Sequence, residues 1–197
     1  LAADEPATAN LDTVVVTATR TDQPRALTGE SMSVITAAEL SASQVVLVTD
    51  ALAQTPGLTI VRNGGVGQTT SIGMRGALTG QTLMLIDGVR INDPSAPDGS
   101  AILADLLVNN VERIEVLRGP QSTLYGSDAI GGVVNILSLR GGTRPGELGA
   151  SAEAGSLASY RGNITAHGTD GAVEYGAGLN YYRTAGISAA DARDGNT

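Results

Sequence analysis

The stretch Val111–Leu117 reads VERIEVL and has the length of one β-strand. We interpret it as a strand in which apolar residues on one face alternate with charged residues on the other. The apolar run Thr82–Ile86 predicts a second strand, which ends at the turn pair Asp87-Gly88. Further short strands are predicted at residues 33–35, 57–61 and 71–76. Together these segments predict a small mixed sheet.

Short helices are predicted beside this sheet. Thr36 is followed by Glu39 in the spacing of a capping box, which marks the start of a helix. A second helix is expected over Val48–Gln54, because Pro56 and Gly57 stop it. A third is expected around Ala101–Leu107. Residues 1–140 therefore predict an α+β domain, with short helices on a small mixed sheet.

A different pattern follows the glycine-rich linker at residues 141–146. Apolar or small residues alternate with polar ones in three segments, 147–154, 160–167 and 173–182. Each is about 8–11 residues long, the length of a tilted membrane-spanning strand. An outer-membrane barrel shows this alternation, and so does a soluble antiparallel sheet with one wet face. The pattern alone leaves both open.

The composition excludes several classes of protein. The net charge is −8 and the arginines are scattered, so we expect no nucleic-acid partner. The absence of cysteine excludes disulfides, cysteine-based zinc sites and thiol catalysis. No apolar run reaches the ~18 residues that a transmembrane helix needs. The start, LAADEPATAN, has no charged region before an apolar stretch, so we expect no signal peptide in it.

The loop Gly64–Thr70 reads GGVGQTT and differs by one letter from a phosphate-binding loop. Such a loop needs a lysine that reaches the β- and γ-phosphates. Gln68 stands at that position, and the sequence contains no lysine. A P-loop ATPase is therefore a remote alternative. Nor does the spacing of Asp87, Glu112 and Glu115 imply a nucleophile or a perturbed carboxylate pair, so we expect no enzyme.

A β-branched run, Leu11–Thr19, stands alone before Pro24. It is either an ordinary strand of the following domain or an extended peptide that adds to the sheet edge of a partner. The residues themselves slightly favour the ordinary strand.

Five further segments form a series of motifs along the chain, at residues 12–18, 72–76, 85–90, 113–120 and 125–136. Taken in order, these motifs resemble the N-terminal part of TonB-dependent outer-membrane receptors, and residues 12–18 resemble the TonB box. The resemblance implies a plug domain followed by the first antiparallel strands of a transmembrane β-barrel. It implies a periplasmic extension with the TonB box at 1–20, a plug domain at 21–142 and barrel strands at 143–197. A closed barrel of this family has about 22 strands, so we expect a longer protein.

The resemblance also implies the site residues. The TonB-binding residues are Asp12, Thr13, Val14, Val15, Val16, Thr17 and Ala18. The substrate-binding residues are Gln68, Thr69 and Thr70 of the glycine loop, with Asp98 and Ser100. Arg75 and Arg118 are expected to pair with glutamates of the barrel. No intrinsic cofactor is expected. Asp191 and Asp194 are either charges of a solvated outer loop, which is the favoured interpretation, or ligands of a calcium ion.

The implied function is active transport of a scarce nutrient across the outer membrane of a Gram-negative bacterium. Energy would come from the inner-membrane proton gradient through TonB, and membrane lipid would surround the barrel. Residues 125–132 and 63–68 resemble most closely the receptors for cobalamin (vitamin B12), so cobalamin is the expected ligand. Residues 92–100 depart from that pattern with extra proline and aspartate. A ferric siderophore or haem receptor is the alternative.

Overall fold

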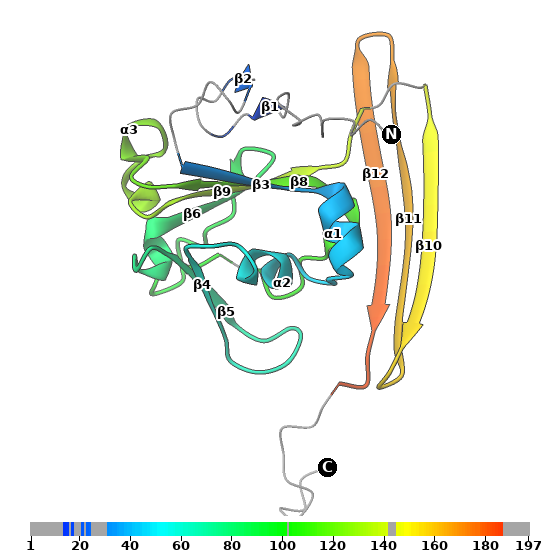
Figure 1. Cartoon of the computed structure of the whole chain (residues 1–197), viewed down its shortest axis with the longest axis horizontal. Helices are drawn as coiled ribbons and strands as arrows, with labels where there is room; N and C mark the ends of the chain where they lie inside the picture. The colour runs from blue at the N-terminus through cyan, green and yellow to red at the C-terminus, as the bar shows by residue number, and fades with distance from the viewer. Residues whose placement is uncertain are drawn as a thin grey trace, which may run out of the picture.

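The computed structural model describes residues 14–15, 17, 21, 23–24, 31–101, 103–141 and 145–186 (Figure 1). A five-stranded sheet lies at its centre, in the order β3-β8-β9-β6-β7. Only β6 and β9 pair in parallel, so the sheet is mixed, as the sequence predicts. Its strands are β3 Ser31–Thr36, β6 Thr82–Ile86, β7 Val89–Arg90, β8 Val111–Arg118 and β9 Gly132–Ser138.

Strand β8 does not separate apolar and charged residues as expected. Ile114 and Val116 share one face, but Glu115 lies beside Leu117 on the other, and all four are fully buried. The register of the pairing with β9 shifts between Val111 and Arg113. The expected clean alternation is therefore wrong. A charged residue can remain on a buried face because other groups satisfy its carboxylate.

Two helices cover one face of the sheet, α1 Ala37–Ser43 and α2 Val48–Ala53 (Figure 1). Thr36 caps α1, and Glu39 completes the capping box that the sequence predicts. Apolar side chains from the helices, from the hairpin β4 Leu58–Arg62 and β5 Thr70–Met74, and from alternate sheet positions form the larger core. Its fully buried members include Val48, Leu52, Met74, Ile114, Val116 and Val134.

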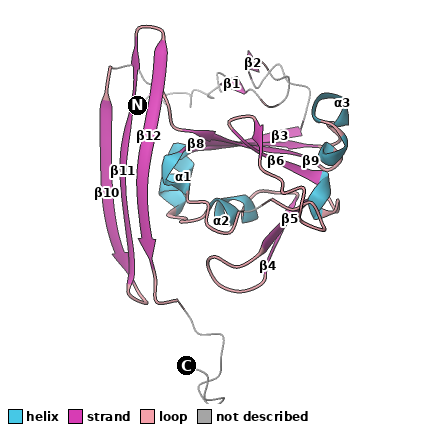
Figure 2. Cartoon of the chain, turned by 180° about the vertical axis from the view of Figure 1, so that it is seen from behind, coloured by secondary structure: helices cyan, strands magenta, loops and turns pink. Residues whose placement is uncertain are grey.

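The N-terminal strand β1 Val14–Val15 lies on the opposite face of the sheet (Figures 1 and 2). It pairs with β2 Gln23–Pro24. Val15 is fully buried in a second apolar cluster, with Met32, Leu83, Leu85, Leu117, Ala129 and Val133. The sheet thus has two apolar faces, one under the helices and one under Val15 of β1.

The helix expected around Ala101–Leu107 is absent from the described residues there. Ala101 instead pairs with Asn92, and Leu107 pairs with Leu47, as isolated bridges. These tertiary contacts override the local helical preference. The remaining short elements are η2 Thr79–Gln81, η3 Val108–Asn110, α3 Ser122–Tyr125 and η4 Ser127–Ala129.

Three long strands form a separate antiparallel sheet, β10 Glu147–Gly155, β11 Ser159–Asp170 and β12 Val173–Arg183. They match the three alternating segments that the sequence predicts. One face of this sheet exposes large apolar side chains, namely Leu148, Tyr160, Ile164, Leu179 and Tyr181. The other face meets the connection between α1 and α2, where Arg161 of β11 donates through Nη1 to the Val45 carbonyl at 3.1 Å. No helix within the described residues is long and apolar enough to cross a membrane.

The molecule has two distinct ends. The loop between β4 and β5 points the same way as the turn between β10 and β11, whereas β1 lies towards the opposite end (Figures 1 and 2). The predicted ligand loop and the predicted partner segment are therefore on opposite sides of the five-stranded sheet.

Candidate functional site

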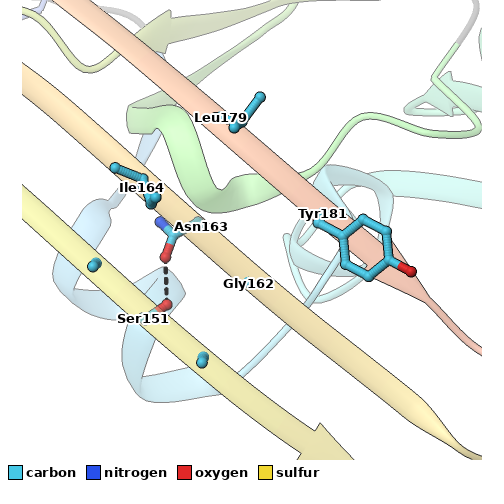
Figure 3. A pocket seen from close by; sticks show the side chains of 8 residues that line it. Ser151, Gly162, Asn163, Ile164, Leu179 and Tyr181 are labelled. Carbon is cyan, nitrogen blue, oxygen red and sulfur yellow. Dashed lines mark hydrogen bonds between the residues drawn. The ribbon is translucent and has the colours of Figure 1, made fainter.

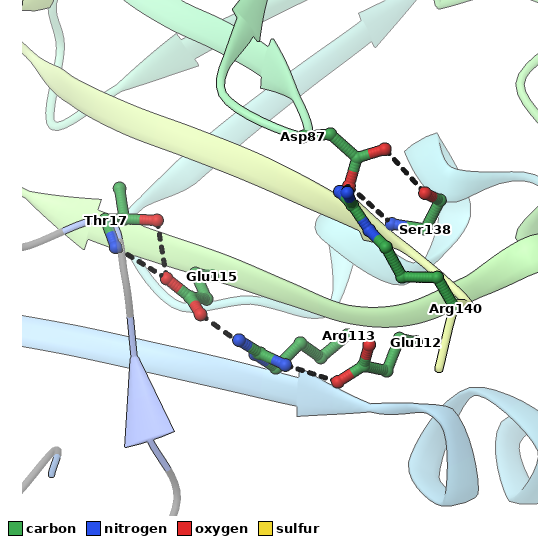
Figure 4. A network of polar contacts seen from close by, with 7 residues as sticks. All are labelled: Thr17, Asp87, Glu112, Arg113, Glu115, Ser138 and Arg140. Carbon is green, nitrogen blue, oxygen red and sulfur yellow. Dashed lines mark hydrogen bonds and ion pairs between the residues drawn. The ribbon is translucent and has the colours of Figure 1, made fainter. Parts of the chain in front are cut away.

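We call the described residues Val14, Val15 and Thr17 the N-terminal segment. Glu115 contacts this segment through its buried carboxylate (Figure 4). Its Oε2 accepts hydrogen bonds from the backbone N–H of Thr17 at 2.8 Å and from Thr17 Oγ1 at 2.5 Å. Its Oε1 accepts a hydrogen bond from Arg113 Nε at 2.9 Å, and Arg113 also pairs with Glu112. Both oxygens of a fully buried carboxylate are thus satisfied, one by a cation and one by the segment.

Tyr125 completes the contact with Thr17, because its hydroxyl donates to the Thr17 carbonyl at 2.8 Å. Tyr125 also packs against the cluster that holds Val15. We call Glu115, Tyr125 and the apolar cluster beneath Val15 the N-terminal docking site. The structure therefore places Val15 and Thr17, two of the predicted TonB-binding residues, in contact with the sheet. Of the others, Val14 is in β1, and Asp12, Thr13, Val16 and Ala18 lie outside the described residues.

The sequence analysis missed this docking site. Glu115 appeared there as a carboxylate without a role, and Tyr125 only as part of a motif. The available signal was the position of Glu115. It lies on the same face of β8 as Leu117, in an otherwise apolar part of the strand.

The glycine loop is exposed from Asn63 to Thr69, and this includes Gln68 and Thr69. Thr70 differs, because it is buried as the first residue of β5 and its Oγ1 donates to the Gln68 carbonyl at 3.0 Å. Gln68 and Thr69 thus offer polar side chains to the outside, whereas Thr70 fixes the backbone of Gln68.

The second predicted ligand segment lies in the loop of residues 92–100. Ser100 donates its backbone N–H to Asp98 Oδ1 at 3.2 Å, and hydrogen bonds from Ser100 hold the pKa of this exposed carboxyl below its usual value. This loop packs against Gly80, where a Cβ would lie 2.3 Å from the Asp98 carbonyl oxygen. In the described part of the chain, no hydrogen bond or ion pair joins Asp98 or Ser100 to Gln68 or Thr69.

The two arginines expected at the interface with the barrel lie close together around Gly57. A Cβ on Gly57 would be 3.4 Å from Arg118 Nε and 3.9 Å from Arg75 Cγ. Arg118 is buried and donates to the Pro56 carbonyl at 2.7 Å and to Ser33 Oγ at 2.6 Å. Arg75 is exposed and donates to Ser31 Oγ at 3.2 Å. The two guanidinium groups thus lie close together beside β3. Among the described residues, Arg75 makes no ion pair.

Asp87 makes a second polar network that the sequence analysis did not predict (Figure 4). Asp87 and Gly88 both have positive φ, 51° and 79°, which suits the tight hairpin turn between β6 and β7. The carboxylate accepts hydrogen bonds from Ser138, from its backbone N–H at 3.0 Å and from its hydroxyl, and pairs with Arg140 at 2.5 Å. Burial alone would raise the pKa of Asp87, but the bonds from Ser138 and Arg140 outweigh it and lower the pKa. These contacts connect the turn between β6 and β7 to Ser138 at the end of β9 and to Arg140, which follows it.

The exposed face of the three-stranded sheet carries a shallow apolar hollow of about 500 Å³ (Figure 3). Ile164, Leu179 and Tyr181 line it with small residues of β10 and β11, and Ser151 pairs with Asn163 beside them. Its walls are almost wholly apolar and open to the outside, so they offer a ligand little that is specific.

The two aspartates expected to bind calcium, Asp191 and Asp194, lie outside the described residues. Among the residues that the structure does describe, no group of three histidines, cysteines or carboxylates could hold a metal ion.

Comparison with known proteins identifies the fold. Residues 24–133 match the family model of the TonB-dependent Receptor Plug Domain. The ferripyoverdine receptor of the Pseudomonas aeruginosa outer membrane superposes with a TM-score of 0.71 over 86% of this chain, at 22% identity. That level of identity supports the shared fold alone.

Two further solved structures are more similar in sequence. The ferric-catecholate import receptor Fiu of E. coli K12 is 28% identical over 82% of this chain, with a TM-score of 0.63. The ferric enterobactin receptor PfeA of Pseudomonas aeruginosa, in complex with enterobactin, is 25% identical over 79%, with a TM-score of 0.59. The chain covers 22%, 22% and 25% of the ferripyoverdine, Fiu and enterobactin structures, so it spans about a quarter of their length or less. The chain therefore belongs to the family of TonB-dependent receptors, outer-membrane proteins of Gram-negative bacteria, through its plug domain.

Proposed function

We propose that this chain is part of a receptor that imports a ferric siderophore across the outer membrane, driven by TonB. The observation that carries the proposal is the match of residues 24–133 to the plug family, combined with the names of the similar receptors. The compared structures at 25–28% identity are named for ferric enterobactin and ferric catecholates. The family consists of transport receptors, so we assign no catalytic step to the chain.

The cobalamin expectation came from residues 63–68 and 125–132. None of the three receptors compared above is named for cobalamin, and the ferric-siderophore alternative has the better support. We therefore make the ferric siderophore the proposed ligand. Motifs of the plug are poor guides to the ligand because the barrel and its outer loops shape most of the binding site.

In this proposal the exposed end of the plug domain contacts the ligand. Gln68 and Thr69 are exposed at the tip of the hairpin and carry hydrogen-bonding groups. Thr70 acts through its bond to the Gln68 carbonyl. Asp98 and Ser100 contact the ligand from the neighbouring loop. These side chains can donate hydrogen bonds to a polar ligand and accept them from it.

At the opposite end, residues 12–18 bind TonB by adding a strand to its sheet. The extended backbone of Val14 and Val15 in β1 supports this part of the proposal. Arg75 and Arg118 pair with glutamates of the barrel, since a guanidinium can bind a carboxylate through two parallel hydrogen bonds. The proposed division is an extension at 1–20, the plug domain at 21–142 and barrel strands at 143–197.

Equilibrium binding to the complete protein, as its gene encodes it, tests the proposed ligand. The panel contains a ferric catecholate, a ferric hydroxamate, haem and cyanocobalamin. We expect one ferric siderophore to bind at least about a hundredfold more tightly than cyanocobalamin, a difference of about 2.7 kcal/mol. Tight binding of cyanocobalamin with no binding of the iron chelates would reject the ferric proposal and restore the cobalamin reading.

A further inference from the structure

An arginine of the three-stranded sheet holds the connection between α1 and α2. Arg161 lies near the start of β11, at the end of this sheet that points the same way as the glycine loop (Figure 1). Its Nη1 donates to the Val45 carbonyl at 3.1 Å, and its side chain is 12% exposed. This contact joins the plug domain to a strand on the other side of the glycine-rich linker.

Glu153 of β10 fixes the direction of this guanidinium. It lies opposite Arg161 in the register of the two strands. Both oxygens of its carboxylate accept hydrogen bonds from Arg161 Nη2, at 2.6 and 2.7 Å. Charge-assisted hydrogen bonds of this length are among the stronger contacts in proteins. Glu153 therefore holds one nitrogen of the guanidinium while the other stays bound to the Val45 carbonyl.

The connection leads directly into a first support of the glycine loop, which is α2. The side chains of Thr49 and Asp50 in this helix both accept hydrogen bonds from Arg62 Nη2, at 2.7 Å each. Arg62 is the last residue of β4, and the next residue, Asn63, donates its backbone N–H to the Thr69 carbonyl at 3.1 Å. Helix α2 thus holds the base of the glycine loop.

A second support reaches the side of the loop from the same connection. Two backbone hydrogen bonds, of 2.9 and 3.1 Å, join residues 46–48 to residues 106–108. Asp105 directly precedes this second segment and lies against the glycine loop, because a Cβ on Gly67 would be 3.3 Å from Asp105 Oδ1. The base and the side of the loop therefore both depend on the short connection that Arg161 holds.

We propose that Arg161 positions the glycine loop relative to the wall formed by β10, β11 and β12. It is a positioning residue, because it acts through the connection at Val45 and contacts neither the loop nor a ligand. That the positioned loop binds a ligand rests on the proposed function, whereas the positioning itself does not. Loss of the contact between Arg161 and Val45 should loosen both supports together and let the loop sample more positions.

Spin labels measure the position of the loop directly, because the 197 residues contain no cysteine of their own. Nitroxides on Val66→Cys, in the exposed glycine loop, and on Ala152→Cys, at an exposed position of β10, report the distribution of distances between loop and wall. A second pair, Ala152→Cys with Leu124→Cys in α3, reports the position of the plug domain as a whole. The experiment uses the complete protein without ligand, with any cysteine elsewhere replaced by serine.

The main variant is Arg161→Met, which keeps a long side chain and removes its donors. We expect the distribution of the loop pair to broaden about twofold while that of the second pair stays unchanged. Glu153→Gln should broaden it less, because Arg161 keeps its bond to Val45 but loses the charged acceptor that orients it. Arg183→Met is the matched control, since the exposed Arg183 side chain of β12 makes no hydrogen bond or ion pair within the described residues. Both of its distributions should match the parent.

Ligand affinity separates this role from the proposed function. In Arg161→Met, the affinity for the ferric siderophore of the panel that binds best should fall about three- to tenfold, because the ligand must then order the loop as it binds. A broader loop distribution with unchanged affinity would keep the positioning role and remove the loop from the ligand site.

Two results would overturn the proposal. One is a distribution of the loop pair that matches the parent in both Arg161→Met and Glu153→Gln. The other is equal broadening of both label pairs, which would show that the contact holds the whole plug domain rather than the loop. If Arg161→Met does not assemble in the membrane, Glu153→Gln decides by the same two criteria.

Discussion

The glycine loop of the plug domain and the N-terminal residues Val15 and Thr17 have opposite surroundings. Residues 63–69 are all exposed, and their polar side chains meet no buried partner. Val15 and Thr17 are fully buried, and the backbone groups of Thr17 are bound by Glu115 and Tyr125. A ligand can therefore bind the loop without displacing anything, whereas a partner of the N-terminal segment must first displace it from the sheet. Binding of a partner to the N-terminal segment therefore carries a cost of displacement that binding of a ligand to the glycine loop does not.

Proline at Val15 should have the largest effect, and only at the N-terminal end. Val15→Pro removes the backbone N–H that strand addition requires and disturbs the pairing with Gln23. We expect uptake to fall to background while ligand affinity stays unchanged. Uptake of labelled siderophore and equilibrium binding, at matched expression, check the two halves of this prediction. Normal uptake by the variant would show that residues 12–18 are not the coupling segment.

The glycine loop should show the converse behaviour with a smaller effect. Replacing Gln68 and Thr69 together by alanine should weaken ligand binding about fivefold, the loss of about 1 kcal/mol expected for one good neutral hydrogen bond. Thr59→Ala, at an exposed position of β4, serves as the control in the same hairpin. Unchanged affinity in the double variant would remove the glycine loop from the ligand site.

The Asp87 network is separate from the loop and the segment and should affect stability alone. Asp87→Asn should lower the free energy of unfolding by about 0.5–1 kcal/mol, because a partly exposed ion pair contributes little. The lowered pKa of Asp87 means that the native state favours the carboxylate, so its contribution is present above the ordinary value near 4 and is lost as the pH falls through the lowered pKa. Denaturant unfolding of the parent and Asp87→Asn proteins should therefore differ at pH 7, and the difference should be smaller at a pH below the lowered pKa of Asp87. A constant difference at both pH values would assign the stabilisation to packing.

Calcium should have the smallest effect of the changes considered. The proposed site at Asp191 and Asp194 offers two carboxylates, whereas calcium takes six to eight oxygen ligands. The calcium hypothesis predicts that millimolar Ca²⁺ tightens ligand binding to the complete protein. Titrating Ca²⁺ against a chelator, with Asp191→Asn as the control, measures this. An affinity that does not change would leave both aspartates as surface charges.

Much of the fold could be predicted from the sequence because its signals are local. Thr36 and Glu39 form their capping box within one turn, and the alternation in β10 to β12 reflects the two faces of each strand. The helix predicted around Ala101–Leu107 was wrong for the converse reason. Its helical preference is weak beside its bridges to Asn92, across the same loop, and to Leu47, in a distant part of the chain.

The candidate sites were less predictable. A glycine loop between two strands is visible in sequence, and its exposure follows from its composition. The burial of Glu115 depends on Thr17, 98 positions earlier in the chain, and on Arg113 beside it. No periodicity or spacing reports such a contact, because a charged residue in a strand is normally assigned to the solvent face. The docking site could therefore be identified only from the structure.

Uptake by living cells tests the central claim most directly. Cells that lack their own siderophore receptors would make the complete protein and be given the ⁵⁵Fe-loaded siderophore that binds best, with and without functional TonB. We predict accumulation of iron that requires both the receptor and TonB and is absent for Val15→Pro. Equal accumulation without TonB, or accumulation of cobalamin but not of iron, would contradict the assignment of this chain to TonB-driven import of a ferric siderophore.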